Sequence, residues 1–319
     1  MNSLGLSIIL KRGCFCAKET IYVNNTKYYL IENLGQGGFS VVDLVENAHT
    51  KKKYALKKII CHAIEDQKNA LREIEITNQL KHDNIIKIID STFKGSADIV
   101  INTISEIFIV LPYFPRGTLA NYLEIRGTTN HHLSVNEICT TFSKICDAVR
   151  CMHEFKPEPI AHRDLKTANI CLTDSLQPVI IDLGSATEAR VKICGSQEAQ
   201  QLQDLAAERC SMPYRAPELF NVESYCMIDE RTDIWSLGCI LYAMCYFKSP
   251  FDTVHERGDS VALAVLSGNI HFPEENAPYP EELHDLIKFI LKVQPSERPF
   301  IYSVLSKTQE LLSKVEMRV

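Results

Sequence analysis

The chain has 319 residues, of which 45% are hydrophobic and 23% are charged. A chain of this length and apolar content can bury a large core and form one large or two smaller domains. Its formal net charge of −6 argues against a nucleic-acid partner, because a protein that binds nucleic acid normally presents a basic face.

Cysteine usage and hydropathy exclude two further classes of protein. The 12 cysteines are scattered along the chain, many of them in apolar segments, and no Cys-x-x-Cys pair with metal-binding spacing occurs. We therefore expect reduced thiols that serve as small hydrophobes, not a disulfide scaffold. No run of about eighteen apolar residues occurs, so the sequence predicts no membrane-spanning helix.

Residues 20–111 combine strand-like runs with one helical stretch. Apolar residues recur roughly on one helical face from about Asp66 to Leu80, which predicts a helix there. This region is expected to form a small β-rich lobe, preceded by an N-terminal arm at residues 1–19. The predicted strands are Tyr28–Leu34, Val41–Glu46, Lys53–Ile60, Ile86–Thr92 and Ile107–Leu111.

A glycine-rich loop joins the first two predicted strands. It follows the pattern G-x-G-x-x-G-x-V, except that Ser40 stands at the third glycine position. Glycine permits a tight turn whose backbone N–H groups can approach phosphates closely. The loop therefore predicts nucleotide-phosphate contacts from Leu34, Gly35, Gly37, Gly38 and Ser40.

A lysine and a glutamate are the next candidates. The segment Tyr54-Ala55-Leu56-Lys57 matches the V-A-I-K strand pattern, which presents a lysine to the α- and β-phosphates. Glu73, within the predicted helix, is the expected ion-pair partner of Lys57, and Glu75 is the alternative.

The pattern changes at residues 112–117, where two prolines and a glycine interrupt the strand pattern as a linker between lobes should. We place a hinge at 112–116, a second lobe at 117–306 and a short C-terminal tail at 307–319. A nucleotide would lie in the cleft between the lobes. Helical spacing in the second lobe predicts helices at Ser134–Phe155, Thr232–Tyr246, Val261–Leu266 and Pro280–Val293.

Two motifs in the second lobe carry the chemistry. His162 to Asn169 follow H-R-D-x-K-x-x-N, and Asp182 to Gly184 follow D-x-G. Phosphoryl transfer needs a carboxylate that orients the attacking hydroxyl, and oxygen ligands for Mg²⁺. Asp164 suits the first role. Asn169 and Asp182 suit the second, with Mn²⁺ as a possible alternative metal.

The segment from Asp182 to Glu218 contains strong helix formers. Ser196 could cap a helix over 197–209, in which Leu202, Leu205 and Ala206 share one face. If that face docks on the second lobe, we expect substantial activity without phosphorylation. Mobility of the whole segment is the alternative. Possible, modulatory autophosphorylation sites are Ser211 and Tyr214.

Over roughly residues 28–305 these motifs resemble the eukaryotic protein kinases. The resemblance implies an α+β, bilobal protein kinase fold with a small β-rich N-lobe and a larger α-helical C-lobe, and it implies ATP and Mg²⁺ as cofactors. By the same resemblance, Lys57, Glu73, Asp164 and Lys166 are catalytic. Lys166 has the serine/threonine-kinase form and would contact the transferred phosphate. Leu111 would be the gatekeeper, and the adenine contacts would be Val42, Ala55, Pro112, Phe114 and Cys171.

The resemblance also assigns structural roles. Ala216-Pro217-Glu218 matches A-P-E, and Arg298 resembles the ion-pair partner of its glutamate. Asp233 would anchor the catalytic loop. Arg163 is the residue that pairs with an activation-segment phosphate in ordinary kinases.

Finer features resemble the Numb-associated kinases. These are Gly-Gly-Phe-Ser in the phosphate loop, Asp-Leu-Gly at 182–184 and the run from Gly258 to Val265. The nearest likeness is to a small member of that family that carries myristoyl and palmitoyl groups.

The N-terminal arm departs from that likeness in part. The second residue is Asn2, so the printed start offers no myristoylation site. Cys14 and Cys16 lie where the lipid-anchored relatives carry paired cysteines, and palmitoylation there would anchor the chain. Lys11 and Arg12 would add about 1 kcal/mol each at an anionic membrane. Two unmodified cysteines in a disordered arm are the alternative.

These observations predict an ATP-dependent kinase that phosphorylates Ser or Thr of protein substrates, and possibly Tyr by autophosphorylation. By resemblance, it would act on the cytoplasmic side of Golgi and plasma membranes and in the cytoplasm, in secretory-pathway signalling. A pseudokinase scaffold is the alternative, but pseudokinases usually lack one of the residues found here as Lys57, Asp164 and Asp182. A small-molecule kinase is disfavoured by the A-P-E segment.

Overall fold

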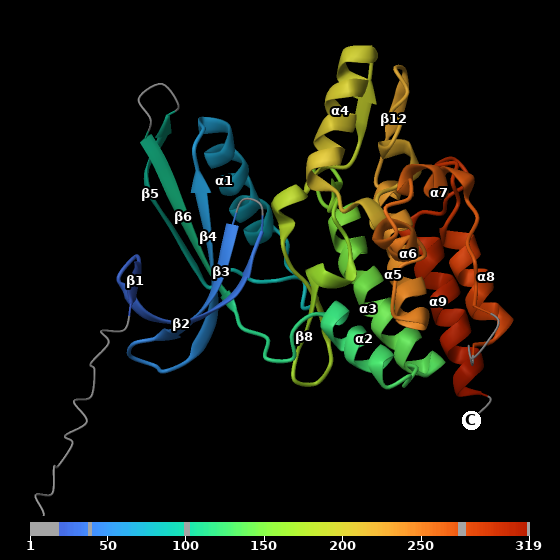
Figure 1. Cartoon of the computed structure of the whole chain (residues 1–319), viewed down its shortest axis with the longest axis horizontal. Coiled ribbons are helices and arrows are strands. Elements are labelled where there is room, and N and C mark those ends of the chain that lie inside the picture. The colour runs from blue at the N-terminus through green and yellow to red at the C-terminus, as the bar shows by residue number, and fades with distance from the viewer. Residues whose placement is uncertain (1–18, 38–39, 99–102, 274–278, 318–319) are drawn as a thin grey trace, which may run out of the picture.

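The computed structural model describes residues 19–317 except 38–39, 99–102 and 274–278. It has a smaller lobe built on a β-sheet and a larger lobe built mainly of helices (Figure 1). The α+β, two-lobed architecture expected from the sequence is therefore confirmed.

The N-lobe contains a six-stranded antiparallel sheet with the strand order β1-β2-β3-β4-β6-β5. Alternate side chains point to opposite faces of a strand, so Leu56 and Val110 enter one apolar cluster while Ile59 and Ile109 enter another. The strands are β1 (Thr20–Val23), β2 (Thr26–Gln36), β3 (Ser40–Asn47), β4 (Lys53–Cys61), β5 (Asp90–Asp98) and β6 (Thr103–Pro112).

Helix α1 (Ile64–Gln79) packs on the sheet through Ala70, which joins the cluster that contains Ile59 and Ile109. The helix begins where the Asp66 carboxylate accepts a hydrogen bond from the Ala63 N–H at 2.9 Å, a contact typical of a helix N-terminus. The helix predicted at about Asp66–Leu80 is thus confirmed, with an earlier start.

The C-lobe is organised around α5, most of whose side chains are buried on every side. Helix α3 is stabilised at its start by a reciprocal capping box, in which Ser134 and Glu137 each bond the other's backbone N–H. The long helices and their neighbours are α2 (Leu119–Thr128), α3 (Val135–His153), α5 (Arg231–Tyr246), α6 (Asp252–Glu256), α7 (Val261–Ser267), α8 (Glu281–Ile290) and α9 (Ile301–Glu316).

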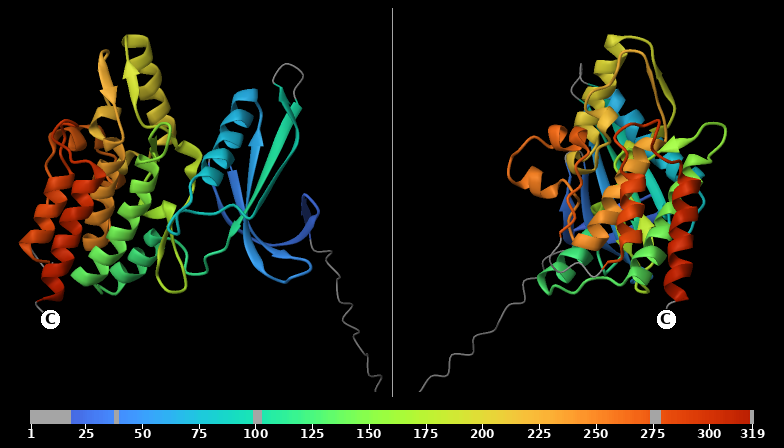
Figure 2. Two further views of the ribbon diagram at one scale, coloured as in Figure 1. Left: turned by 180° about the vertical axis from the view of Figure 1, so that it is seen from behind. Right: turned by 90° about the vertical axis from the view of Figure 1, so that its right-hand side faces the viewer.

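The face of the C-lobe nearest the N-lobe consists of short strands and turns. Antiparallel pairs form between β8 and β9, between β7 and β10, and between β11 and β12. Helix α4 stands beside the antiparallel β11–β12 pair and projects from the lobe (Figure 2). The elements are β7 (Ile160–Ala161), β8 (Ile170–Leu172), β9 (Pro178–Ile180), β10 (Thr187–Glu188), β11 (Val191–Ile193), α4 (Ser196–Arg209) and β12 (Cys226–Ile228). Single 3₁₀ turns lie at Thr167–Asn169, Leu183–Ser185, Met212–Tyr214 and Pro217–Leu219.

One predicted strand is displaced. The strand expected at Ile86–Thr92 is found at Asp90–Asp98, as β5. Residues 85–89 instead run between the lobes, where the Ile86 N–H donates to the Ile180 carbonyl at 2.9 Å. Of the apolar residues that suggested a strand there, Ile86 joins the C-lobe core, Ile88 packs on the N-lobe cluster that contains Ile109, and Ile89 is 51% exposed. β1 and α2 were not predicted separately.

The C-terminal segment also differs from its prediction. The tail expected at 307–319 continues α9 as far as Glu316. Thr308 and Leu311 are buried, because α9 lies against α3. The helical spacing of apolar residues therefore extends the C-lobe core beyond the expected boundary at residue 306.

Cysteines and helices of the described part fit the sequence analysis. Its ten cysteines are all free thiols, and six of them are buried: Cys61, Cys139, Cys146, Cys210, Cys239 and Cys245. Among the described residues, none of the helices combines the length and apolar character needed to cross a bilayer.

Candidate active site

The catalytic loop, residues 162–169, is hydrogen-bonded to Asp233 at the start of α5. One carboxylate oxygen accepts the His162 N–H at 2.8 Å, and the other accepts the Arg163 N–H at 2.9 Å. Arg163 has a φ of 67°, a left-handed conformation that is costly for a side-chain-bearing residue. The two hydrogen bonds from the loop to Asp233 hold it there.

Asp233 itself is fully buried and hydrogen-bonded to His153 at 3.0 Å. Burial raises the pKa of the Asp233 carboxyl, but the hydrogen bond and positive charge from His153 outweigh that effect and lower it. The anchor is therefore an ionised carboxylate, as a group that accepts several N–H donors should be.

Asp164 is held by three donors. Its Oδ2 accepts the Asn169 amide at 3.0 Å and lies 2.9 Å from the Lys166 ammonium. Its Oδ1 accepts the backbone N–H of Ser211 at 2.8 Å. These contacts fix the orientation of a carboxylate that is only 9% exposed, so it points to one place in the cleft.

Lys57 lies across the cleft from Asp164, on β4. Its ammonium is 2.7 Å from Glu73 Oε1 and 2.7 Å from Asp182 Oδ1. Burial lowers the pKa of Lys57, but the nearby Asp182 and Glu73 carboxylates more than offset this and raise it, so the ammonium stays charged. Glu75, the alternative partner, is exposed and bonds Gln79 instead.

The turn after β9 brings Asp182 to this site. Asp182 has a φ of 60°, and Leu183 behind it is buried in the C-lobe core. A Cβ on Gly184 would lie 3.2 Å from Glu73 Oε2, so glycine allows the turn to approach α1 closely. Asn169 lies beside Asp164, and its carbonyl accepts the Ile181 N–H at 2.9 Å. An amide oxygen and a carboxylate of this kind fit Mg²⁺, which also takes phosphate oxygens and water.

A cavity of about 420 Å³ lies between the lobes and brings the two groups of residues together. The described part of the glycine loop borders it: Gly37 and Ser40 line the cavity, and the Gly37 N–H donates to the Ser40 carbonyl at 2.8 Å. Gly38 lies outside the described residues. The other lining residues assigned from the sequence are Lys57, Glu73, Asp164, Lys166 and Asp182.

The proposed adenine contacts lie at the edge where the lobes join. Ala55 and Leu111 are cross-strand partners in the β4–β6 ladder, and Tyr54 pairs with Pro112 in the same way. On the C-lobe side, Cys171 forms a bridge to Thr118, and burial raises the pKa of its thiol to about 11. Gly35 and Val42 are cross-strand partners between β2 and β3, and Val42 also pairs with Lys57 of β4. Leu34 is 42% exposed and Phe114 is half-buried.

Glu218 and Arg298 form the expected pair. The guanidinium donates two parallel hydrogen bonds, at 2.7 and 2.8 Å, to the two oxygens of the carboxylate. Arg298 is 2% exposed, and it also donates to the carbonyls of Arg231, Lys292 and Val293. A buried fork of this kind attaches the end of the activation segment to the C-lobe.

The helix expected in the activation segment is present as α4, but its capping differs from the prediction. The N-cap residue is Gly195, and Ser196 makes no side-chain capping bond. The Glu198 carboxylate accepts the Cys194 N–H at 2.7 Å and supports the first turn instead. The longer acidic side chain of Glu198 reaches back over the turn, so the serine is not needed there.

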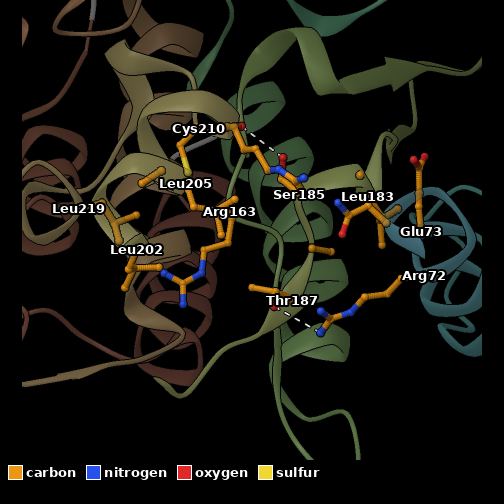
Figure 3. Close-up of a pocket in the computed structure, with 15 residues that line it drawn as sticks. Arg72, Glu73, Arg163, Leu183, Ser185, Thr187, Leu202, Leu205, Cys210 and Leu219 are labelled. Atoms are coloured by element: carbon orange, nitrogen blue, oxygen red, sulfur yellow. Dashed lines mark hydrogen bonds between the residues drawn. The ribbon is translucent and has the colours of Figure 1, made fainter. Parts of the chain in front are cut away.

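Helix α4 packs through its small residues. Ala199 and Ala206 are buried, whereas Leu205 is 43% exposed. Leu202 and Leu205 border a second cavity, of about 210 Å³. Figure 3 shows these leucines on one side of that cavity and Arg72 and Glu73, from α1, on the other. The docking face predicted from Leu202, Leu205 and Ala206 is thus only partly buried.

The two possible phosphorylation sites are both engaged. Tyr214 is 8% exposed, and its hydroxyl lies 3.1 Å from the Thr167 hydroxyl. Burial raises the pKa of Tyr214, and another kinase could not reach the hydroxyl in this arrangement. The Ser211 hydroxyl accepts a hydrogen bond from Lys166 at 2.6 Å. Ser211 therefore belongs to the catalytic network, a contact that the sequence analysis missed.

The sequence analysis also missed an ion pair in the activation segment. Arg190 donates two hydrogen bonds to Glu230, from positions forty residues apart in the sequence. Neither residue lies in a recognised motif, so the sequence carried no signal for it. Cys14 and Cys16, the possible acylation sites, lie outside the described residues.

Comparison with known proteins gives an independent measure of likeness. A family model described as protein kinase domain matches residues 28–308. The chain is 41% identical to serine/threonine-protein kinase 16 of Homo sapiens over 298 residues, covering 93% of this chain and 94% of that protein. The same identity and coverage are found with the Rattus norvegicus protein of that name. A probable serine/threonine-protein kinase of Dictyostelium discoideum is 31% identical over 365 residues, covering 94% and 98% of the two chains.

Proposed function

This chain belongs to the protein kinase family and is a serine/threonine-protein kinase, and from that premise we propose which residues carry out the transfer of phosphate from ATP to protein substrates. Asp164 accepts the proton of the substrate hydroxyl. Lys57 binds the α- and β-phosphates. Asn169 and Asp182 hold Mg²⁺, which neutralises the phosphate charge when bound. The observation that carries this proposal is the single cavity lined by both Lys57 and Asp164.

The chain's own contacts support these roles. The three donors around Asp164 orient its carboxylate before any substrate arrives. Such preorganisation lowers the reorganisation required when the hydroxyl reacts. Lys166, between Asp164 and the Ser211 hydroxyl, is placed to bind the transferred phosphate.

A pseudokinase scaffold has no comparable support. Lys57, Asp164 and Asp182 are all present, and each is held by hydrogen bonds to a charged or polar partner. The irregular positions of the motifs, Ser40 and Leu183, supply no charge to the reaction.

We further propose that the protein works at membranes. The support is the sequence alone: the likeness to the Numb-associated kinases and the pair Cys14 and Cys16 beside Lys11 and Arg12. Palmitoylation of both cysteines would give the two signals that stable anchoring requires. The sites proposed from the likeness are Golgi and plasma membranes, with a role in secretory-pathway signalling.

The test of the activity is phosphate transfer from Mg-ATP to a generic basic protein, followed by phosphoamino-acid analysis. We expect phosphoserine and phosphothreonine with the wild-type chain and a large loss with Asp164→Asn. Equal incorporation by both proteins would reject the roles assigned here.

A further inference from the structure

Arg190 lies in the activation segment, between β10 and β11. Its Nε donates to Glu230 Oε2 at 3.0 Å, and its Nη2 donates to Glu230 Oε1 at 2.7 Å. Two parallel bonds of this kind fix the orientation of both groups. The arginine side chain is 55% exposed, but that of Glu230 is only 6% exposed. The pair therefore draws an exposed segment onto a buried carboxylate.

Glu230 depends on this partner. Burial raises the pKa of its carboxyl, but the hydrogen bond from Arg190 more than offsets that effect and lowers it. A carboxylate that loses its partner while it stays buried is strongly unfavourable. Removal of Arg190 should therefore leave a charge that can only be relieved by protonation or by movement of the surrounding chain.

The pair also connects to the catalytic loop. Ala189, next to Arg190, accepts a hydrogen bond from Arg163 Nη2 at 3.0 Å. Glu230 immediately precedes α5, whose Asp233 holds the backbone of Arg163. Hydrogen bonds therefore connect the activation segment to the catalytic loop and to the start of α5, and the catalytic loop to α5 in turn.

Arg163 supplies a second observation. It is 8% exposed, and its Nε and Nη1 atoms have no hydrogen-bond partner among the described residues. The Arg163 guanidinium thus meets the segment through a backbone carbonyl, not through a side-chain carboxylate. The ion pair that attaches this part of the segment is formed by Arg190, the residue after Ala189, with Glu230.

We propose that the Arg190–Glu230 pair is a positioning element for phosphoryl transfer, which holds the unphosphorylated activation segment in its productive arrangement. This inference rests on the proposed function, since it concerns the same active site. Arg190 touches neither Asp164 nor Lys57 in the structure, so it acts through the segment.

The path from Arg190 to the active site runs along the activation segment through β11 and α4. Arg190 is followed by β11, whose three residues pair with β12, a ladder too short to be stable by itself. Helix α4 comes next, and it leads to Ser211, whose N–H binds Asp164. If β11 detaches from β12, α4 loses its fixed start, and the contact with Asp164 loosens.

The experiment compares wild type with Arg190→Ala, Arg190→Lys and Glu230→Gln. For each protein we would measure kcat, the KM for ATP and for a protein substrate, the Tm, and the rate of cleavage after Lys192 by a lysine-specific protease. Lys192 is exposed in β11, so its cleavage reports separation of β11 from β12. Lys288→Ala is the matched control, because it removes a half-exposed ion pair with Glu281 on α8, away from the segment.

We expect Arg190→Ala to lower kcat on the order of tenfold, as small misplacements in active sites do, with the KM for ATP within about twofold of wild type. Cleavage after Lys192 should accelerate. Arg190→Lys should recover part of kcat, because it keeps the charge but not the two parallel hydrogen bonds. Glu230→Gln should lower kcat less than Arg190→Ala, because it removes the ion pair without leaving an unpaired buried charge. The control should match wild type in kcat and cleavage.

A lower Tm with unchanged kcat and unchanged cleavage after Lys192 would assign the pair a purely structural role and overturn the proposal. If Arg190→Ala fails to fold, Arg190→Lys and Glu230→Gln decide the question by the same readouts. Failure of the proposed function is distinguishable, since it would appear as a wild-type chain without phosphate transfer, whereas failure of this proposal would appear as an active wild type with variants of unchanged kcat.

Discussion

At the scale of single residues, the site is built from charges that are oriented before any substrate binds. Asp164 shows this most clearly, because its two oxygens are occupied by donors from Asn169, Lys166 and Ser211. Each donor restricts rotation of the carboxylate. The lone-pair directions that remain can then accept the proton of an incoming hydroxyl.

Replacing Asp164 by asparagine tests this role directly. The Asp164→Asn side chain keeps its size but cannot take up a proton, so we expect kcat to fall by about a thousandfold, the scale of general-base contributions. The KM for ATP should stay near the wild-type value, because the lost interaction forms only in the transition state. Steady-state kinetics with Mg-ATP measures both. The matched control is Asp174→Asn, at an exposed position after β8, and wild-type turnover by Asp164→Asn would contradict the assignment.

Asp233 predicts a pH dependence of stability. Its pKa is lowered in the folded state by His153 and by the backbone donors, despite burial. A depressed folded-state pKa stabilises the fold above the unfolded-state value, about 3.9 for aspartate, and that stabilisation is lost as pH falls through the folded-state pKa. Asp233→Asn should lower the free energy of unfolding by about 3 kcal/mol at neutral pH. The difference in Tm from wild type should shrink below about pH 4, which thermal scans at several pH values would measure; a constant difference would refute the linkage.

The roles of site residues could be predicted from the sequence where those residues lie close together within one motif. Asp164, Lys166 and Asn169 lie within one loop, so their grouping follows from local geometry. The Lys57–Glu73 pair required only a strand followed by a helix. In contrast, Arg190 and Glu230 are brought together by the path of the whole activation segment, and an arginine and a glutamate far apart are most often separate surface residues.

At the scale of elements, periodicity predicted long helices better than short strands. α3 is buried along one face and α5 is buried almost throughout, so both helices show a clear pattern of apolar residues in the sequence. β5 contains Lys94, Gly95 and Ser96, and most of its residues are exposed or half-buried. An edge strand of this kind has little apolar alternation, so the sequence could not mark it.

Helix α4 leads to a prediction about regulation. Its small residues pack on the C-lobe, the pairing of β11 with β12 holds its start, and the Glu218–Arg298 ion pair holds the end of the segment. Because this order arises from packing and ion pairs, it does not need a phosphate on the segment. We expect phosphatase-treated wild-type protein to retain more than about half of the initial rate of untreated protein.

The measurement requires two controls. Mass spectrometry should verify that residues 182–218 carry no phosphate after treatment, and Asp164→Asn should give the background rate. Ser211 is unsuitable for substitution here because its hydroxyl binds Lys166. A treated enzyme that stays inert until another kinase modifies the segment would show that α4 is insufficient.

At the scale of the whole molecule, the reaction depends on two lobes that each hold part of the site. Lys57 and Glu73 come from the N-lobe, and Asp164 and Asp182 come from the C-lobe. The order of motifs along the chain was sufficient to predict this division. It was not sufficient to predict that α9 completes the C-lobe, since its later turns carry no motif and are ordered by packing on α3.

The N-terminal arm is expected to decide where the folded kinase acts. Cys14 and Cys16 lie close enough for two acyl chains to enter one patch of membrane, and Lys11 and Arg12 would add attraction to anionic lipid. One acyl chain gives weak, reversible binding, so loss of both should release the protein. We expect Cys14→Ser with Cys16→Ser to move the chain from the membrane fraction to the soluble fraction, with kcat on a soluble substrate unchanged.

Cys194→Ser is the matched control, because Cys194 is an exposed thiol of the folded domain. Acyl-exchange labelling would report the modification itself. A wild-type chain that is wholly soluble in its own cells, or a double variant that stays on membranes, would contradict anchoring through these cysteines.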